Sequence, residues 1–214
     1  MKNKLFIALF AISFCSFAQT ADNKNNISIG FGTQSYNGVL ANTWFDFGYE
    51  WYGVLPISYS RYLNNSFDGT VSTTIGDFGH CQNDPDDIQF WPDGVKKLAM
   101  SSRLITGNVS IKYKFANGYL LKEDAKISPY VYAGVGINDV MNDQWTLGRV
   151  NAGIYYTLTG GAGVRYNFTE KFSFTYNIGF GMFNNDKMDY GDVNSPHPMN
   201  PIYMQNTYTL GYNF

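Results

Sequence analysis

Residues 172–182 of the chain read FSFTYNIGFGM. Every second residue in it is aromatic or aliphatic, and the residues between them are serine, threonine, asparagine and glycine. Successive side chains of a β-strand point to opposite faces, so a pattern of period two predicts a strand with one apolar and one polar face.

The segment just before this stretch has the same pattern. In residues 154–168, apolar side chains such as Leu158 and Val164 alternate with polar ones such as Thr157 and Arg165. Only a short segment around Glu170 separates the two strands. The pair therefore predicts a hairpin with a tight turn.

The whole chain contains eight segments of this kind. The predicted strands cover residues 26–35, 54–63, 66–76, 103–115, 127–138, 154–168, 172–183 and 203–214. Each is about as long as the roughly 9–11 residues that a tilted strand needs to cross a bilayer. The composition agrees with strands and turns, since 18% of the residues are aromatic and only 15% are charged.

The connections between these strands alternate in length. The long ones cover residues 36–53, 77–102, 139–153 and 184–202. The others are short turns at Asn64-Asn65 and Glu170-Lys171 and an intermediate connection at residues 116–126. Long extracellular loops and short periplasmic turns are typical of outer-membrane barrels. We therefore predict an all-β fold, an eight-stranded antiparallel transmembrane β-barrel with both termini on the periplasmic side.

A soluble β-sandwich also alternates, so the placement of aromatic residues matters. In a membrane barrel, aromatic side chains gather where the apolar face meets the interface. Here they occur at strand ends, beside the predicted short turns and at the C-terminus: Tyr113, Phe115, Phe168, Phe172, Tyr212 and Phe214. This girdle favours the membrane barrel over the sandwich.

The N-terminus has the pattern of a signal peptide. Lys2 and Lys4 precede an apolar run over residues 5–14, and Ala18 provides a small residue for cleavage. We expect residues 1–18 to be removed and residues 19–214 to form the barrel domain. No later stretch approaches the roughly 18 apolar residues of a membrane helix.

Cysteine and charge exclude several other classes. The bulky Phe14 before Cys15 disfavours lipidation at that cysteine. Cleavage of the leader leaves Cys81 as the single cysteine, so no intramolecular disulfide is expected. The net charge of -2 lacks the basic excess of nucleic-acid-binding proteins.

The last strand, YTLGYNF at residues 208–214, resembles the terminal strand of OmpX-like and OmpA-like outer-membrane barrels. The segment SPYVYAGVG, residues 128–136, is similar to a recurrent strand of the OmpA-like transmembrane domain. The resemblance implies localisation in the cell outer membrane, in contact with its lipid. It also implies that Gly211, Tyr212 and Phe214 form the signal read by the outer-membrane assembly machinery. The chain stops at the final strand of the barrel, so no peptidoglycan-binding domain is expected.

An eight-stranded barrel has an interior just wide enough for side chains to fill. We predict a polar core in the lumen in which Lys112 and Arg165 pair with Asp68. A structural ion pair is favoured over a gate or proton path. Arg61 fits neither face, so either it extends to the membrane interface or the register there is shifted.

An enzyme is the main alternative function, since some barrels of this size modify lipid A. Asp77, His80, Ser101 and Ser102 could meet at the rim in a nucleophilic site. Loops are rich in such residues and no motif frames these four, so no catalytic residue is predicted and no enzyme is expected. A channel for small hydrophobic molecules is the other alternative.

Metal binding is also weakly supported. The ligand types at His80, Cys81, Asp84, Asp86 and Asp87 match no zinc spacing. The acidic run at residues 186–192 fails as an EF-hand, because Met188 and Tyr190 fall where oxygen ligands belong. We therefore expect no metal and no cofactor.

The aromatic run at residues 44–52 is either a recognition surface or part of the outer interfacial belt. We expect the four long loops to carry the function, either structural or as contacts with a surface ligand that the sequence does not identify.

Overall fold

The computed structural model describes residues 24–37, 51–81, 90–91, 94–95, 99–141, 152–184 and 201–214. The predicted signal peptide at residues 1–18 lies outside these residues. No described segment forms a helix long and apolar enough to cross a membrane.

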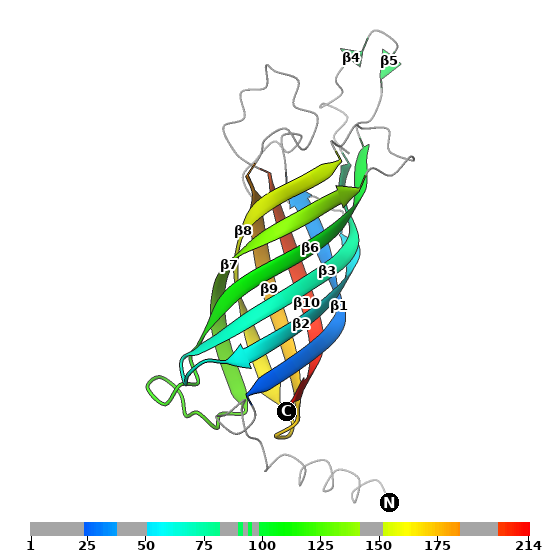
Figure 1. Ribbon diagram of the computed structural model, residues 1–214. Coiled ribbons are helices and arrows are strands. Elements are labelled where there is room, and N and C mark those ends of the chain that lie inside the picture. The colour runs from blue at the N-terminus through cyan, green and yellow to red at the C-terminus, as the bar shows by residue number, and fades with distance from the viewer. Residues whose placement is uncertain are drawn as a thin grey trace, which may run out of the picture.

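The described residues form ten strands, and eight of them close into a barrel. The strands are β1 (Asn25–Asn37), β2 (Tyr52–Tyr62), β3 (Phe67–Cys81), β4 (Phe90–Trp91), β5 (Gly94–Val95), β6 (Ala99–Lys114), β7 (Ile127–Met141), β8 (Gly153–Asn167), β9 (Phe172–Phe183) and β10 (Ile202–Asn213). The barrel order is β1-β10-β9-β8-β7-β6-β3-β2, and all of its neighbours pair antiparallel (Figure 1). The predicted fold class is confirmed.

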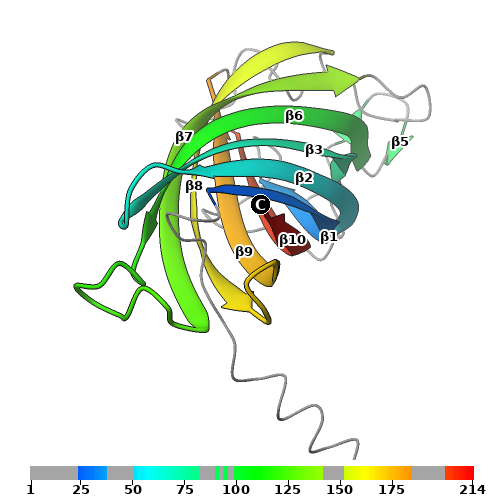
Figure 2. The ribbon, with the colours of Figure 1, turned by 60° about the horizontal axis from the view of Figure 1, so that its bottom comes forward.

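Pairing of the first and last barrel strands closes the wall. Asn26 of β1 lies opposite Asn213 of β10, and the pairing continues to Asn37 opposite Ile202. Closure leaves the described strands of the barrel wall without an open edge, which a wall in hydrocarbon requires. The end that holds the C-terminus and the turns at residues 63–66, 115–126 and 168–171 is called the turn end below (Figure 2). The opposite end is the loop end.

Several strands run further than the sequence pattern predicts, and the largest extensions are in β3 and β6. β3 and β6 continue to pair until Cys81 lies opposite Ala99, so the prediction that residues 77–102 form only a loop is wrong at both ends. The apolar alternation stops near the charged pair Asp77 and Arg103, but backbone pairing continues past it. The small sheet of β4 and β5, in which Phe90 lies opposite Val95, was not predicted.

The outer wall is apolar and exposed along its length. Val109, Val135, Leu158 and Leu210 each expose between 59% and 62% of their surface. A soluble sandwich would bury such a face, whereas a membrane barrel turns it toward lipid. The geometry therefore supports the membrane barrel and opposes the sandwich.

Charged and aromatic residues mark the two borders of this apolar band. Near the loop end, Arg103 donates to Asp77 across 3.2 Å, and both side chains are half exposed. At the turn end, aromatic rings meet in pairs 5.1–5.4 Å apart. These pairs are Phe67 with Tyr113, Tyr166 with Phe168, and Phe172 with Tyr212.

Arg61 belongs to the outward row at the turn end. It is exposed, and it lies opposite Asn25 on one side and Gly69 on the other. Its neighbours in the same row are Ile57 and Tyr59, so the register is not shifted. A long cationic side chain at this level can extend to the membrane interface, which is the first of the two alternatives that the sequence left open for Arg61.

Inside the wall, glycines of β8 and β9 make room for tyrosines. A Cβ atom added to Gly163 would come within 2.4 Å of the Tyr130 hydroxyl oxygen, and one added to Gly179 within 2.2 Å of the Tyr132 hydroxyl oxygen. At Gly181 the nearest atom would be Cζ of Tyr203, at 2.2 Å. In the interior, each of these tyrosine rings therefore fills the space that a side chain at the facing glycine would occupy.

We expect Gly163→Ala to destabilise the barrel by about 1–3 kcal/mol, because the added methyl group must displace Tyr130 or the backbone of Tyr176. Gly107→Ala is the matched control, since its Cβ would face outward with no atom nearer than 3.9 Å. Alanine also restricts the unfolded chain, so that variant should gain a few tenths to about 1 kcal/mol. Urea unfolding in vesicles measures both changes. Equal effects of the two variants would contradict the packing argument.

Candidate functional site

The strongest polar cluster of the described residues lies inside the barrel near the turn end. Asp68 of β3 is fully buried, and its carboxylate accepts a 2.6 Å hydrogen bond from Lys114 Nζ of β6. Arg165 Nη1 of β8 lies 4.0 Å from the other carboxylate oxygen. Alternation aims all three side chains inward, so three strands contribute to one buried ion cluster.

Lys112 is inside as well, but its contacts differ from the prediction. Its Cα lies directly opposite that of Asp68. Its ammonium nevertheless donates to Ser60 Oγ at 3.4 Å and sits 5.2 Å from the centre of the Tyr130 ring. The predicted pairing of Lys112 with Asp68 is therefore replaced by Lys114, two residues along the same face.

Lys114 reaches Asp68 diagonally across the two strands. Diagonal neighbours in an antiparallel pair are within reach of long side chains. The Lys114 ammonium also lies 4.4 Å from the centre of the Tyr62 ring. These two contacts of the ammonium explain why Lys114, and not Lys112, pairs with Asp68.

A polar cavity of about 90 Å³ lies beside the ion cluster, on the side toward the loop end. Its lining includes Lys112 and Arg165 together with the hydroxyls of Tyr130 and Tyr132 and many serine, threonine and asparagine side chains. Each buried water needs at least roughly 10–15 Å³ of such space, so the cavity has room for a few waters. It is too small to form a pore on its own.

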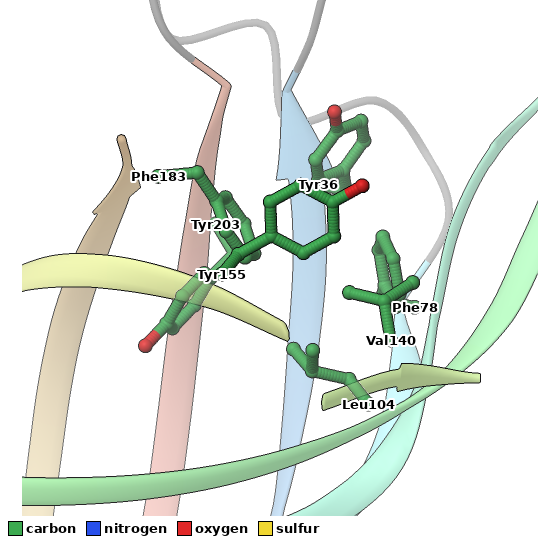
Figure 3. Packing of buried hydrophobic residues seen from close by; sticks show 7 residues of the cluster. All are labelled: Tyr36, Phe78, Leu104, Val140, Tyr155, Phe183 and Tyr203. Atoms are coloured by element: carbon green, nitrogen blue, oxygen red, sulfur yellow. The ribbon is translucent and has the colours of Figure 1, made fainter. Parts of the chain in front are cut away.

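Apolar side chains cross the interior at the loop end. Seven barrel strands each contribute one buried residue to this cluster, called the loop-end plug. Its members are Tyr36, Phe78, Leu104, Val140, Tyr155, Phe183 and Tyr203 (Figure 3). None exposes more than 8% of its surface.

The rings of the loop-end plug pack edge to face. Tyr36 meets Phe78 at 5.3 Å between ring centres, and Phe183 meets Tyr155 at 6.2 Å and Tyr203 at 5.4 Å. These are favoured aromatic geometries. The plug lies on the loop-end side of the polar cavity, whose lining includes the plug member Tyr203, and it was not predicted from the sequence.

The residues of the hypothetical catalytic set do not all converge. Asp77 faces outward and pairs with Arg103, whereas Ser102 is buried and donates to the Met141 carbonyl oxygen. The two side chains thus lie on opposite faces of the wall. The side chains of His80 and Ser101 lie outside the described part of the structure.

The hypothetical metal ligands fall largely outside the described residues. This holds for Asp84, Asp86, Asp87 and the run at residues 186–192, and for the side chains of His80 and Cys81. Within the described part of the chain, no group of three His, Cys, Asp or Glu residues could hold a metal ion. Of the aromatic run at residues 44–52, the structure describes Trp51, which is 42% exposed, and Tyr52, which begins β2.

The predicted assembly signal occupies the end of β10. Tyr212 and Phe214 point outward, and Tyr212 contacts Phe172 at 5.4 Å and Phe214 at 6.2 Å between ring centres. Gly211 faces inward, where a Cβ would come within 2.7 Å of both Asn26 Nδ2 and Ser173 Oγ. The three residues therefore lie at the seam with β1, at the turn end.

Comparison with solved structures places this fold among outer-membrane barrels. The chain is similar to Neisserial surface protein A, with a TM-score of 0.57, 11% identity, and coverage of 89% of this chain and 97% of the other. OprG from Pseudomonas aeruginosa gives a TM-score of 0.52 at 13% identity, with coverage of 94% and 97%. Ail, the attachment invasion locus protein of Yersinia pestis in complex with the heparin analogue sucrose octasulfate, gives 0.51 at 12% identity, with coverage of 89% and 98%.

These likenesses concern the fold alone, because the identities are low. No family model matches the sequence, and no curated protein matches it. The class defined so far is an eight-stranded barrel of the outer-membrane type with an apolar wall and a packed interior.

Proposed function

We propose that the chain is an exported, integral outer-membrane protein related to the OmpX-like and OmpA-like barrels, and that its barrel is a closed anchor for surface loops. The observation that carries this proposal is the loop-end plug, which fills the interior below the strand ends from which the long connections leave. A wall sealed in this way offers its surroundings the lipid-facing band, the turns at one end and the long loops at the other.

The plug also argues against a channel for small hydrophobic molecules. A solute entering from the loop end would have to displace the packed rings of Tyr36, Phe183 and Tyr203. Behind them it would meet the polar cavity and the buried Asp68–Lys114 pair. An apolar solute gains nothing from such a path.

Absence of catalysis is part of the proposal. It is supported by the opposite orientation of Asp77 and Ser102, which removes that pair from any common nucleophilic site. Outer-membrane lipid is the proposed surrounding of the wall. The assembly machinery is the proposed reader of Gly211, Tyr212 and Phe214, which lie together at the turn end of the closing strand.

Closure of the lumen predicts no steady ion conductance. In planar bilayers, the mature chain should insert without opening a channel, because the plug excludes water from the loop end. Truncation of two plug rings, Phe183→Ala with Tyr203→Ala, should introduce measurable conductance. Steady conductance of the unmodified chain would refute the closed-anchor proposal.

The four loop segments are acidic in sequence. Residues 38–50, 82–98, 142–151 and 185–200 together hold ten acidic and four basic side chains. The acidic ones are Asp46, Glu50, Asp84, Asp86, Asp87, Asp93, Asp143, Asp186, Asp189 and Asp192, and the basic ones are Lys96, Lys97, Arg149 and Lys187. Such a balance repels polyanions and favours basic or neutral partners.

We therefore do not expect this chain to share the ligand class named for Ail. The folded protein in detergent should pass through immobilised heparin at physiological salt, because the loop charges oppose sulfate groups. Replacing Asp84, Asp86 and Asp87 with lysine is the matched gain-of-binding control. If the unmodified chain were retained on heparin and released by salt, the argument that its acidic loops repel sulfate groups would be contradicted.

A further inference from the structure

The connection between β6 and β7 differs from the other two connections at the turn end. The turns at residues 63–66 and 168–171 carry Asn64, Asn65, Thr169 and Glu170 at their tips. The connection at residues 115–126 is longer and presents Tyr119, Leu120 and Leu121 in succession. From the sequence alone, this segment is expected only to be a connection of intermediate length.

These three side chains are unusually exposed for apolar residues. Tyr119 exposes 88% of its surface, Leu120 61% and Leu121 42%. Their neighbours Ala116 and Asn117 are buried. The base of the connection is therefore packed, and its tip projects three adjacent large apolar groups.

Hydrogen bonds define the shape of this tip. Asn117 Oδ1 accepts from the backbone nitrogens of Tyr119 at 3.0 Å and Leu120 at 3.2 Å. The Gly118 nitrogen donates to the Leu121 carbonyl oxygen at 2.8 Å, and φ of +84° at Gly118 is in the region that favours glycine. The sequence thus specifies a turn that holds the apolar tip in place.

The connection leans outward rather than across the mouth of the barrel. In two views it projects sideways from the rim (Figures 1 and 2). Asn65 donates to Glu123, which ties it to the adjacent turn between β2 and β3. The Leu121 nitrogen donates to the Phe115 carbonyl oxygen at 3.0 Å, and the Phe115 ring lies 5.5 Å from that of Tyr113, so the apolar tip is tied to the aromatic border of the lipid-facing wall.

We propose that Tyr119, Leu120 and Leu121 insert into the lipid leaflet at the turn end and bind the membrane surface beside the barrel. The proposal rests on the membrane placement stated under Proposed function. Continuity with the lipid-facing wall favours lipid over a second protein as the occupant, and burying three adjacent apolar side chains at a bilayer surface is favourable. The charged residues that follow, Lys122, Glu123 and Asp124, are exposed and suit the headgroup layer.

The test uses the mature chain with Cys81→Ser and one new cysteine carrying an environment-sensitive NBD dye, folded into phosphatidylcholine and phosphatidylglycerol vesicles. In Leu120→Cys, the dye should emit at short wavelength and lose most of its fluorescence to lipids bearing a nitroxide quencher. Asp124→Cys, in the same connection but on its polar arm, should lose little. Ile111→Cys, on the lipid-facing wall and 56% exposed, is the positive control.

The outcomes separate this inference from the proposal it rests on. Strong quenching at position 111 with water-like emission at position 120 would overturn lipid insertion of the connection and leave the membrane barrel intact. Weak quenching at both positions would overturn both. If the emission at position 120 shifts only when the protein density in the vesicles rises, the apolar tip contacts a second copy of the chain. That result would also overturn the inference.

Discussion

Asp68→Asn should destabilise the folded barrel by about 3–5 kcal/mol, because removal of one partner of a buried ion pair leaves the other charge uncompensated. Among the described residues of the interior, Asp68 is the single buried carboxylate, and it pairs with Lys114 and Arg165. Asparagine keeps the shape of the side chain, so the loss reports charge rather than packing. The free energy of unfolding is measured by urea titration in vesicles, with gel mobility of the unheated sample as the readout of folding.

Asp77→Asn is the matched control for this variant. It removes the same charge from a pair whose side chains are 57% and 50% exposed. Exposed ion pairs contribute about 0–1 kcal/mol, so the control should lose little. A second variant that combines Asp68→Asn with Lys114→Met should recover part of the loss. Similar small losses for Asp68→Asn and Asp77→Asn would mean that cavity water screens the cluster.

The fold was predictable because the two faces of a barrel strand meet different surroundings, lipid outside and a polar lumen inside. Each wall strand must turn apolar groups to lipid and polar groups inward, so residues 172–182 show the period directly. The strand ends were less predictable. Beyond Asp77 and Arg103 the apolar alternation in the sequence stops, although the backbone pairing continues to Cys81 and Ala99.

The same boundary explains why the loop-end plug was missed. Tyr36, Phe78 and Val140 fall in segments predicted as loops, because the strand pattern had already ended there. The structure turns them inward at the level where the wall leaves the apolar band. The sequence did contain one indication of the plug. Alternation puts Tyr155 and Tyr203 on the inward face, and two large rings at one end of the lumen suggest that this end is closed.

Within the ion cluster, residue identities were more predictable than their pairing. Alternation placed Asp68, Lys112 and Arg165 inside the barrel, and the structure has all three there. The choice between Lys112 and Lys114 depended on side-chain reach. Both lysines share the inward face of β6, and only the arrangement of Tyr62, Tyr130 and Ser60 distinguishes them.

The lipid-facing assignment, on which the proposed function depends, is tested by the depth at which a charge is placed. Val109→Lys puts a charge near the middle of the outward row of β6, whereas Ile127→Lys puts one at the turn-end border of β7. The two native side chains are almost equally exposed, at 59% and 55%, so depth is the main difference between them. A lysine on the lipid face costs about 2–4 kcal/mol at the midplane and about 0–1 kcal/mol near the interface.

We therefore expect Val109→Lys to lose far more stability in vesicles than Ile127→Lys. In detergent micelles, which deform around a charge more readily than a bilayer, the gap between the two variants should shrink. Near-neutral effects of both variants would indicate that the wall faces water. Equal large losses would mean that Ile127 lies deeper than the border assigned here. Only a depth-dependent loss agrees with an apolar band bounded by Asp77 and Arg103 at one end and by the aromatic pairs at the other.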